Sequence, residues 1–136
     1  MTLHSITLQL PERIYLRLQQ VAQATQQSLD DVFLRVLQIG SPPSWEDVPA
    51  EFQADLAALD RLDDAALWRV ARSKQVQDMN LYQTLLDKNA NNSLNESERQ
   101  TLTTLRREAD RFMLRKAQSV ALLRWRGHQI PPANKL

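Results

Sequence analysis

The chain has 136 residues, no cysteine and a formal net charge of +1. The lack of cysteine excludes a disulfide framework, a zinc–thiolate site and a thiol nucleophile, and the small net charge gives no general attraction to nucleic acid or membranes. Because the sequence shows neither a signal-peptide pattern nor an apolar run long enough to cross a bilayer, we expect a cytoplasmic protein with no membrane contact. The low glycine content and the long proline-free middle predict a mostly helical fold.

The first expected element is a short strand near the N-terminus. Apolar and polar residues alternate strictly here, so that Ile6, Leu8 and Leu10 share one face. A period of two residues is typical of a half-buried strand. The opposite face of this strand carries three uncharged polar residues: Ser5, Thr7 and Gln9.

Two short helices are expected after the strand. Pro11 suits the first position of a helix, and apolar residues then recur at helical spacing as far as Ala22. Ser28 is expected to cap the second helix, with Asp31 completing a capping box, and Gly40 is expected to end it. One strand and two short helices cannot enclose a core, and an unpaired strand leaves backbone groups unsatisfied. We therefore expect a homodimer.

This order of elements resembles the ribbon-helix-helix family, which includes bacterial repressors and the antitoxins of toxin–antitoxin systems. The resemblance covers residues 1–40 and implies an obligate dimer whose two strands pair antiparallel and enter the major groove of DNA. It also implies a transcriptional regulator that binds a protein toxin. Carried over by position, the DNA-binding residues would be Ser5, Thr7 and Gln9 at the bases, with Ser28 and Leu29 at the phosphates.

Two features of the same region favour dimerisation without DNA binding. The expected strand has no arginine or lysine, and Asp30 and Asp31 at the start of the second helix oppose an incoming phosphate. DNA binding draws much of its affinity from phosphate neutralisation, and residues 1–40 carry no net charge. The alternative function is therefore a non-enzymatic dimeric interaction or scaffold protein.

Residues 41–50 read as a proline-rich linker. Three prolines exclude a regular helix or a central strand in this segment. Trp45 is its one large apolar residue. It is expected either to pin the linker onto a helix or to anchor a partner protein, since tryptophan is enriched at interface hot spots.

Residues 51–127 are expected to form a helical, partner-binding region. The first helix would carry Phe52, Leu56 and Leu59, the second would start at Asp63 or Asp64, the third would run from about Asp78 to Leu86, and the fourth from about Glu96 to Arg126. Asn95 and Glu98 form a capping-box pattern at the start of the last helix. That helix would be about 45 Å long, which exceeds what three short helices need, so one end is expected to pack on another chain or a partner. Residues 128–136 are expected to be a flexible tail.

Charge is distributed unevenly over these helices. Residues 41–70 carry a net charge of −5 and residues 71–136 a net charge of +6, so the two segments could attract each other within one chain, pair across a dimer or serve as separate docking surfaces. One face of the long helix is basic, and it reads either as a solvated face or as a surface for nucleic acid or an acidic partner. The candidate partner-binding residues are Trp45, Arg111, Arg115, Arg124, Trp125 and Arg126.

The helical segment also resembles, in its pattern, the C-terminal parts of small uncharacterised bacterial proteins encoded beside toxin–antitoxin genes. The stretches that carry this resemblance are EFQADLAALDRLDDAALWRVARSK and LDKNANNSLNESERQTLTTLRREADRFMLRKAQSVALLRWRG. It implies a protein partner and no catalytic residue.

Residues 87–98 have the length of an EF-hand calcium loop. The candidate oxygen ligands are Asp87, Asn89, Asn91, Ser93, Asn95 and Glu98. Asn92 stands where glycine is usual, and Lys88 lies inside the loop. The alternative is a plain turn between two helices, because asparagine-rich turns also arise from turn chemistry and capping.

No catalytic constellation is recognisable in the sequence. His4 and His128 lie at opposite ends of the chain, and there is no phosphate-binding glycine loop or nucleophile elbow. We expect no enzymatic activity, no cofactor and no small-molecule substrate. The sequence favours an antitoxin-like DNA-binding regulator with a toxin-like protein partner, and the dimeric scaffold protein is the alternative.

Overall fold

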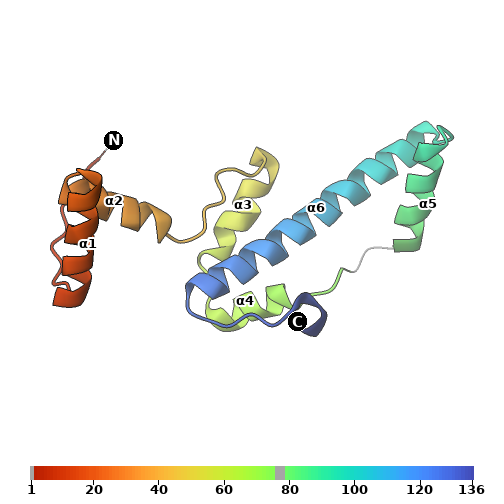
Figure 1. Ribbon diagram of the computed structural model, residues 1–136. Helices are drawn as coiled ribbons and strands as arrows, with labels where there is room; N and C mark the ends of the chain where they lie inside the picture. The colour runs from red at the N-terminus through yellow and green to blue at the C-terminus, as the bar shows by residue number, and fades with distance from the viewer. Residues whose placement is uncertain (1, 76–78) are drawn as a thin grey trace. The chain divides into compact units, whose positions relative to one another are not determined.

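The computed structural model describes residues 2–75 and 79–136, and this part of the chain contains helices but no β-strand (Figure 1). The chain divides into two compact units, Met1–Ser41 and Pro42–Leu136. The first unit contains α1 (Glu12–Thr25) and α2 (Leu29–Ile39). The second contains α3 (Ala50–Leu59), α4 (Asp64–Ala71), α5 (Met79–Ala90), α6 (Glu96–Trp125) and a 3-10 turn, η1 (Ala133–Lys135).

The strand predicted at residues 5–10 is wrong. Residues 2–10 form neither helix nor strand, and all their side chains are exposed. A strand is stabilised by hydrogen bonds to a neighbouring strand, and the described residues of this chain offer none. The ribbon-helix-helix architecture is therefore not seen, whereas the expectation of a mostly helical fold is confirmed.

The first unit is a hairpin of two helices. The carbonyl of Pro11 accepts hydrogen bonds from the amides of Ile14 and Tyr15 at 3.0 and 3.1 Å, which starts α1. Ser28 caps α2 as predicted, because its Oγ accepts a hydrogen bond from the amide of Asp31 at 3.1 Å. The turn between the helices places Gln26 in the left-handed region, with a φ of 54°.

The core of the second unit lies where α3 and α4 pack on the C-terminal half of α6 (Figure 1). Both short helices contribute leucines that are almost completely buried. The buried cluster consists of Leu56, Leu59, Leu67, Ala71, Leu122 and Leu123. The predicted helix start at Asp63 is confirmed, since its Oδ1 accepts a hydrogen bond from the amide of Ala66 at 2.8 Å.

The N-terminal half of α6 packs against α5 (Figure 1). Leu85 of α5 and Leu102 of α6 are both buried. The predicted capping box is confirmed, because Asn95 Oδ1 accepts from the amide of Glu98 while Glu98 Oε1 accepts from the amide of Asn95. The predicted α5 ended too early, since the helix continues to Ala90. Its predicted start at Asp78 lies outside the described residues.

The proline-rich segment and the C-terminal segment both pack onto the second unit. Trp45 and Val48 from the former, and Ile130 and Leu136 from the latter, lie against the buried cluster. This placement differs from the flexible tail that the sequence suggested for residues 128–136, and it matches the suggestion that Trp45 pins the linker onto a helix. None of the described helices combines the length and the apolar character that a membrane span requires.

Candidate docking surfaces

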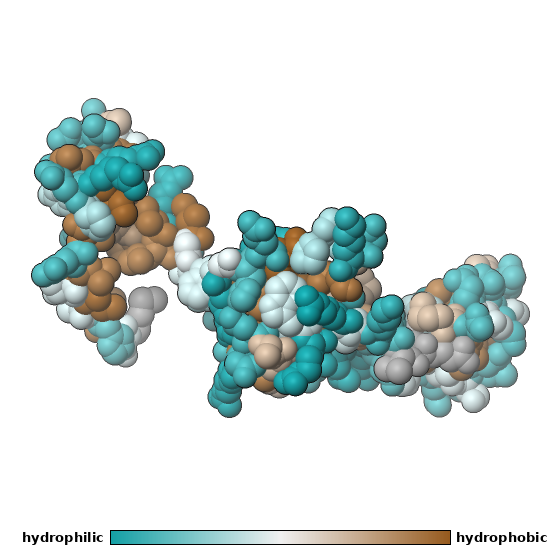
Figure 2. Space-filling model, turned by 90° about the horizontal axis from the view of Figure 1, so that it is seen from below, coloured by the Kyte–Doolittle hydropathy of each residue, from teal (hydrophilic) through white to brown (hydrophobic). Residues whose placement is uncertain are grey.

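The first unit exposes most of its apolar side chains. Only Ala22 and Val32 are buried among its described residues, and twelve of the sixteen exposed large hydrophobic residues described in the chain lie here. These twelve residues are defined here as the N-terminal apolar surface: Leu3, Ile6, Leu8, Leu10, Ile14, Tyr15, Leu16, Val21, Leu34, Val36, Leu37 and Ile39. Figure 2 shows apolar residues gathered over this unit. Soluble proteins rarely leave such a surface uncovered.

The residues predicted to bind DNA lie at two places in the first unit. Ser5, Thr7 and Gln9 are exposed in the irregular segment before α1, so no ribbon aligns them for reading bases. Ser28 and Leu29 lie at the start of α2, where the hydroxyl of Ser28 already accepts a hydrogen bond from the amide of Asp31. Two carboxylates in the same first turn give this helix end a negative charge.

Part of the basic face of α6 is paired with the acids of α3. Arg107 Nε lies 3.0 Å from Glu51 Oε2, and Arg111 Nε lies 2.8 Å from Asp55 Oδ2. Both partners advance by four residues between the two pairs, so α3 and α6 run in the same direction where they meet. The acidic and basic segments therefore attract each other within one chain, which was one of the possibilities the sequence left open.

A second charged cluster joins the end of α6 to the start of α4. Arg126 Nη1 donates to Asp64 Oδ1 at 2.8 Å and to the carbonyl of Leu62 at 2.9 Å. His128 Nε2 lies 2.7 Å from Asp64 Oδ2, and its ring meets the Trp68 ring edge-on. Hydrogen bonds from Arg126, and then from His128, hold the pKa of Asp64 below its ordinary value.

Five cations of α6 make no ion pair within the described residues: Arg99, Arg106, Arg115, Lys116 and Arg124. Lys116 is partly engaged, since its ammonium donates to the carbonyl of Ser73 at 3.2 Å and lies 5.9 Å from the centre of the Phe112 ring. The side chain of Trp125 is 50% exposed. Of the predicted partner-binding cations, Arg115 and Arg124 are therefore those that pair with no acid among the described residues.

Trp45 is used within the second unit. Its Nε1–H donates to Asp60 Oδ2 at 3.0 Å, and its half-buried ring packs against the core cluster. Gln53 reinforces the same segment, because its amide donates to the carbonyls of Glu46 and Val48. This arrangement matches the first of the two roles suggested for Trp45, which was to pin residues 41–50 onto a helix.

The candidate calcium residues lie at the turn between α5 and α6. Asp87 and Asn89 are still inside α5, so the first four residues of the supposed loop are helical. The carboxylate of Glu98 forms an ion pair with Lys88 Nζ at 2.6 Å and accepts the capping-box hydrogen bond from the amide of Asn95. These contacts hold the pKa of the Glu98 carboxyl below its ordinary value. The described residues contain no cluster of three or more potential metal ligands from histidine, cysteine, aspartate and glutamate.

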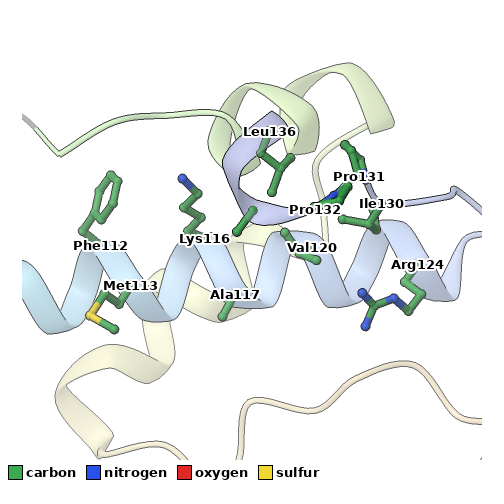
Figure 3. Close-up of a pocket in the computed structure, with 11 residues that line it drawn as sticks. Phe112, Met113, Lys116, Ala117, Val120, Arg124, Ile130, Pro131, Pro132 and Leu136 are labelled. Atoms are coloured by element: carbon green, nitrogen blue, oxygen red, sulfur yellow. The ribbon is translucent and has the colours of Figure 1, made fainter.

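A groove of about 670 Å³ runs between α6 and the C-terminal segment (Figure 3). It is defined here as the α6 groove. Its lining side chains are mostly apolar, with two cations and no acidic side chain. The lining residues are Phe112, Met113, Lys116, Ala117, Val120, Arg124, Ile130, Pro131, Pro132, Ala133 and Leu136.

Comparisons of the chain with protein families, curated proteins and solved structures found no match.

Sequence reasoning missed the α6 groove and the cluster around Asp64. A signal for the groove was present, since Ile130 is an apolar residue followed directly by two prolines, which favour an extended segment able to lie along a helix. His128 was set aside because of its place near the end of the chain. Its contact with Asp64 spans 64 residues, and no local pattern reports a contact of that range.

Proposed function

We propose that this protein is a non-enzymatic, self-associating interaction protein. Its first unit joins two copies of the chain, and its second unit presents a helical surface to a protein partner. The N-terminal apolar surface is the observation that carries the proposal. A hairpin whose described residues bury only Ala22 and Val32 has too small a core to be stable alone in water.

The energetics favour burial of this surface. Full burial of a leucine, isoleucine or valine side chain stabilises by about 1.5–3 kcal/mol. The exposed fractions of Leu34, Leu37 and Ile39 on α2 are 58, 61 and 75%, so most of that free energy is available to an association. A few such residues from each copy would stabilise a dimer by several kcal/mol before the cost of association is subtracted.

A second copy of the chain is the occupant that best fits the N-terminal apolar surface. The unit carries three bases and three acids, so two copies meet without net repulsion. A two-fold dimer buries the same patch of both protomers and is the commonest oligomer of soluble proteins. Two helical hairpins can form a four-helix bundle, in which each hairpin completes the core of the other.

Sedimentation equilibrium tests self-association directly. We expect the full chain to be dimeric at micromolar concentration, and Leu37→Glu to weaken the dimer at least about tenfold by placing a charge in the apolar contact. Gln20→Glu, an exposed position on α1, is the matched control and is expected to leave the dimer intact. A wild-type chain that stays monomeric at about 100 μM, or a Leu37→Glu variant that associates normally, contradicts the proposal.

A DNA-binding regulator is the second candidate function. The unpaired cations Arg106, Arg115 and Arg124 favour it, since they could contact phosphates. A titration with DNA from the protein's own promoter, carried out over a range of salt and with or without a co-expressed neighbour protein, separates the two candidates. The interaction-protein proposal expects no specific complex; a specific complex whose affinity falls steeply with salt favours the regulator.

A further inference from the structure

The α6 groove is bounded by two adjacent rows of α6 side chains and by the C-terminal segment. Phe112, Lys116 and Val120 follow each other at intervals of four residues and form one row, as Figure 3 shows. Met113 and Ala117 begin the neighbouring row, and Met113 is 65% exposed. An exposed apolar floor of this kind is what an amphipathic helix covers when it binds in a groove.

The charges of the groove select the kind of helix. Lys116 and Arg124 lie eight residues apart on α6, and the lining contains no acidic side chain. Arg124 is exposed and makes no ion pair within the described residues. A helix that brings carboxylates beside its apolar stripe would complement these cations, whereas a basic helix would be repelled.

On the neighbouring face of α6, arginines are already paired with acidic side chains of another helix. There α3 places Phe52 and Leu56 in the core while Glu51 and Asp55 pair with arginines of α6. A helix that brings both apolar and acidic side chains is therefore a ligand that α6 accepts within its own chain. The α6 groove repeats the combination of apolar side chains and cations, but no helix from the described residues covers it.

We infer that the α6 groove binds an acidic amphipathic helix of a partner protein. The span from Phe112 to Arg124 is about 18 Å, which corresponds to about three turns of the bound helix. This inference rests on the proposed partner-binding role of the second unit and names the chemistry of the partner. It does not depend on self-association through the first unit.

A synthetic peptide is the probe for this inference. The peptide is a lactam-bridged helix of about twelve residues with leucine on one face and glutamate beside it. Methyl NMR of the full chain with labelled methionine follows its binding, because Met113 lies on the groove floor while Met79 begins α5. We expect saturable binding with a Kd of tens to hundreds of micromolar, and a shift of the Met113 signal without a shift of the Met79 signal.

Single-residue variants locate the contact. Fluorescence anisotropy of the labelled peptide compares the variants, because Met113→Glu removes the methionine signal. Met113→Glu is expected to abolish binding, and Arg124→Glu is expected to weaken it about tenfold, while Arg124→Lys retains most of the affinity. Arg106→Glu is the matched control, since Arg106 is an exposed α6 cation outside the groove, and it is expected to change the Kd less than about twofold. Circular dichroism establishes that each variant keeps the wild-type helix content.

Three outcomes would overturn the inference: no binding at millimolar peptide, equal binding of a peptide with glutamine in place of glutamate, or unchanged binding to Met113→Glu. Sedimentation keeps this test separate from the proposed self-association. Met113→Glu is expected to leave the dimer intact, and Leu37→Glu is expected to leave peptide binding intact. Failure of one proposal therefore does not imply failure of the other.

Discussion

The two units of this chain bury their apolar residues to very different degrees. In Pro42–Leu136 three helices enclose leucines such as Leu56, Leu67 and Leu123, which are at most 1% exposed. In Met1–Ser41 the larger apolar side chains remain in contact with water, and Leu3 and Ile6 are at least 80% exposed. The second unit thus contains a complete core, whereas the first has the composition of a core and too few elements to enclose it.

This difference separates stability from association. Residues buried within the second unit determine whether that unit folds, while apolar residues exposed on the first determine what the protein binds. All three tryptophans, Trp45, Trp68 and Trp125, belong to the second unit. Tryptophan fluorescence therefore monitors the unfolding of the second unit without a direct signal from the first.

The largest expected effect comes from removing a core side chain of the second unit. Leu67→Ala creates a cavity at a position that is 0% exposed and is expected to lower the free energy of unfolding by about 2–5 kcal/mol. Leu37→Ala in the first unit is expected to change the tryptophan-monitored free energy by less than about 0.5 kcal/mol. Urea titrations of both variants measure these free energies of unfolding. Similar losses for the two variants would contradict the claim that only the second unit has a complete core.

Loss of the cap of α6 is expected to have a smaller effect. Asn95→Ala leaves the amide of Glu98 without its partner and is expected to destabilise the second unit by about 1 kcal/mol. Ser97→Ala, two residues further along the same exposed turn, serves as the control and is expected to cause no loss. Hydrogen exchange at the first turn of α6 should increase in the first variant only.

Acid is expected to weaken the contact between α4 and the end of α6. Because the pKa of Asp64 is lower in the folded chain than in the unfolded chain, its contribution is present above the unfolded pKa and is lost as pH falls through the folded pKa. Asp64→Asn should therefore reduce the Tm near neutral pH and reduce its fall between about pH 5 and pH 2. A variant whose Tm falls as steeply in acid as that of the wild type would contradict this role.

The smallest effect is expected at Ser119. This side chain is completely buried in α6, and its hydroxyl has no hydrogen-bond partner within the described residues. Ser119→Ala removes an unsatisfied polar atom and is expected to leave stability unchanged or to raise it by about 0.5 kcal/mol. A clear loss of stability in urea titration would indicate that the hydroxyl has a partner in solution.

The sequence predicted those features that depend on local spacing. Helical periodicity placed α3 and α6, and the chemistry of helix caps predicted the roles of Ser28, Asp63 and Asn95, because each cap involves residues within one turn. The alternating pattern at residues 5–10 gave a wrong prediction because a strand, unlike a helix cap, depends on a partner outside the local sequence. An alternating pattern describes one side of a strand pair, and no other described segment supplies the second side.

The long-range pairings could not be predicted from the sequence. The opposite charges of residues 41–70 and 71–136 were visible, but the pairing of Glu51 with Arg107 depends on the relative register of two helices. The α6 groove depends in the same way on where the segment after Gly127 lies. Both are consequences of packing between elements far apart in the chain, which periodicity does not encode.

Hydrogen exchange at two protein concentrations tests the central claim most directly. If a second copy completes the first unit, amide protection of α1 and α2 rises between nanomolar and high micromolar protein, while protection of α4 and the C-terminal half of α6 stays constant. Protection of α1 and α2 that is the same at both concentrations would contradict the claim that association completes the core of the first unit.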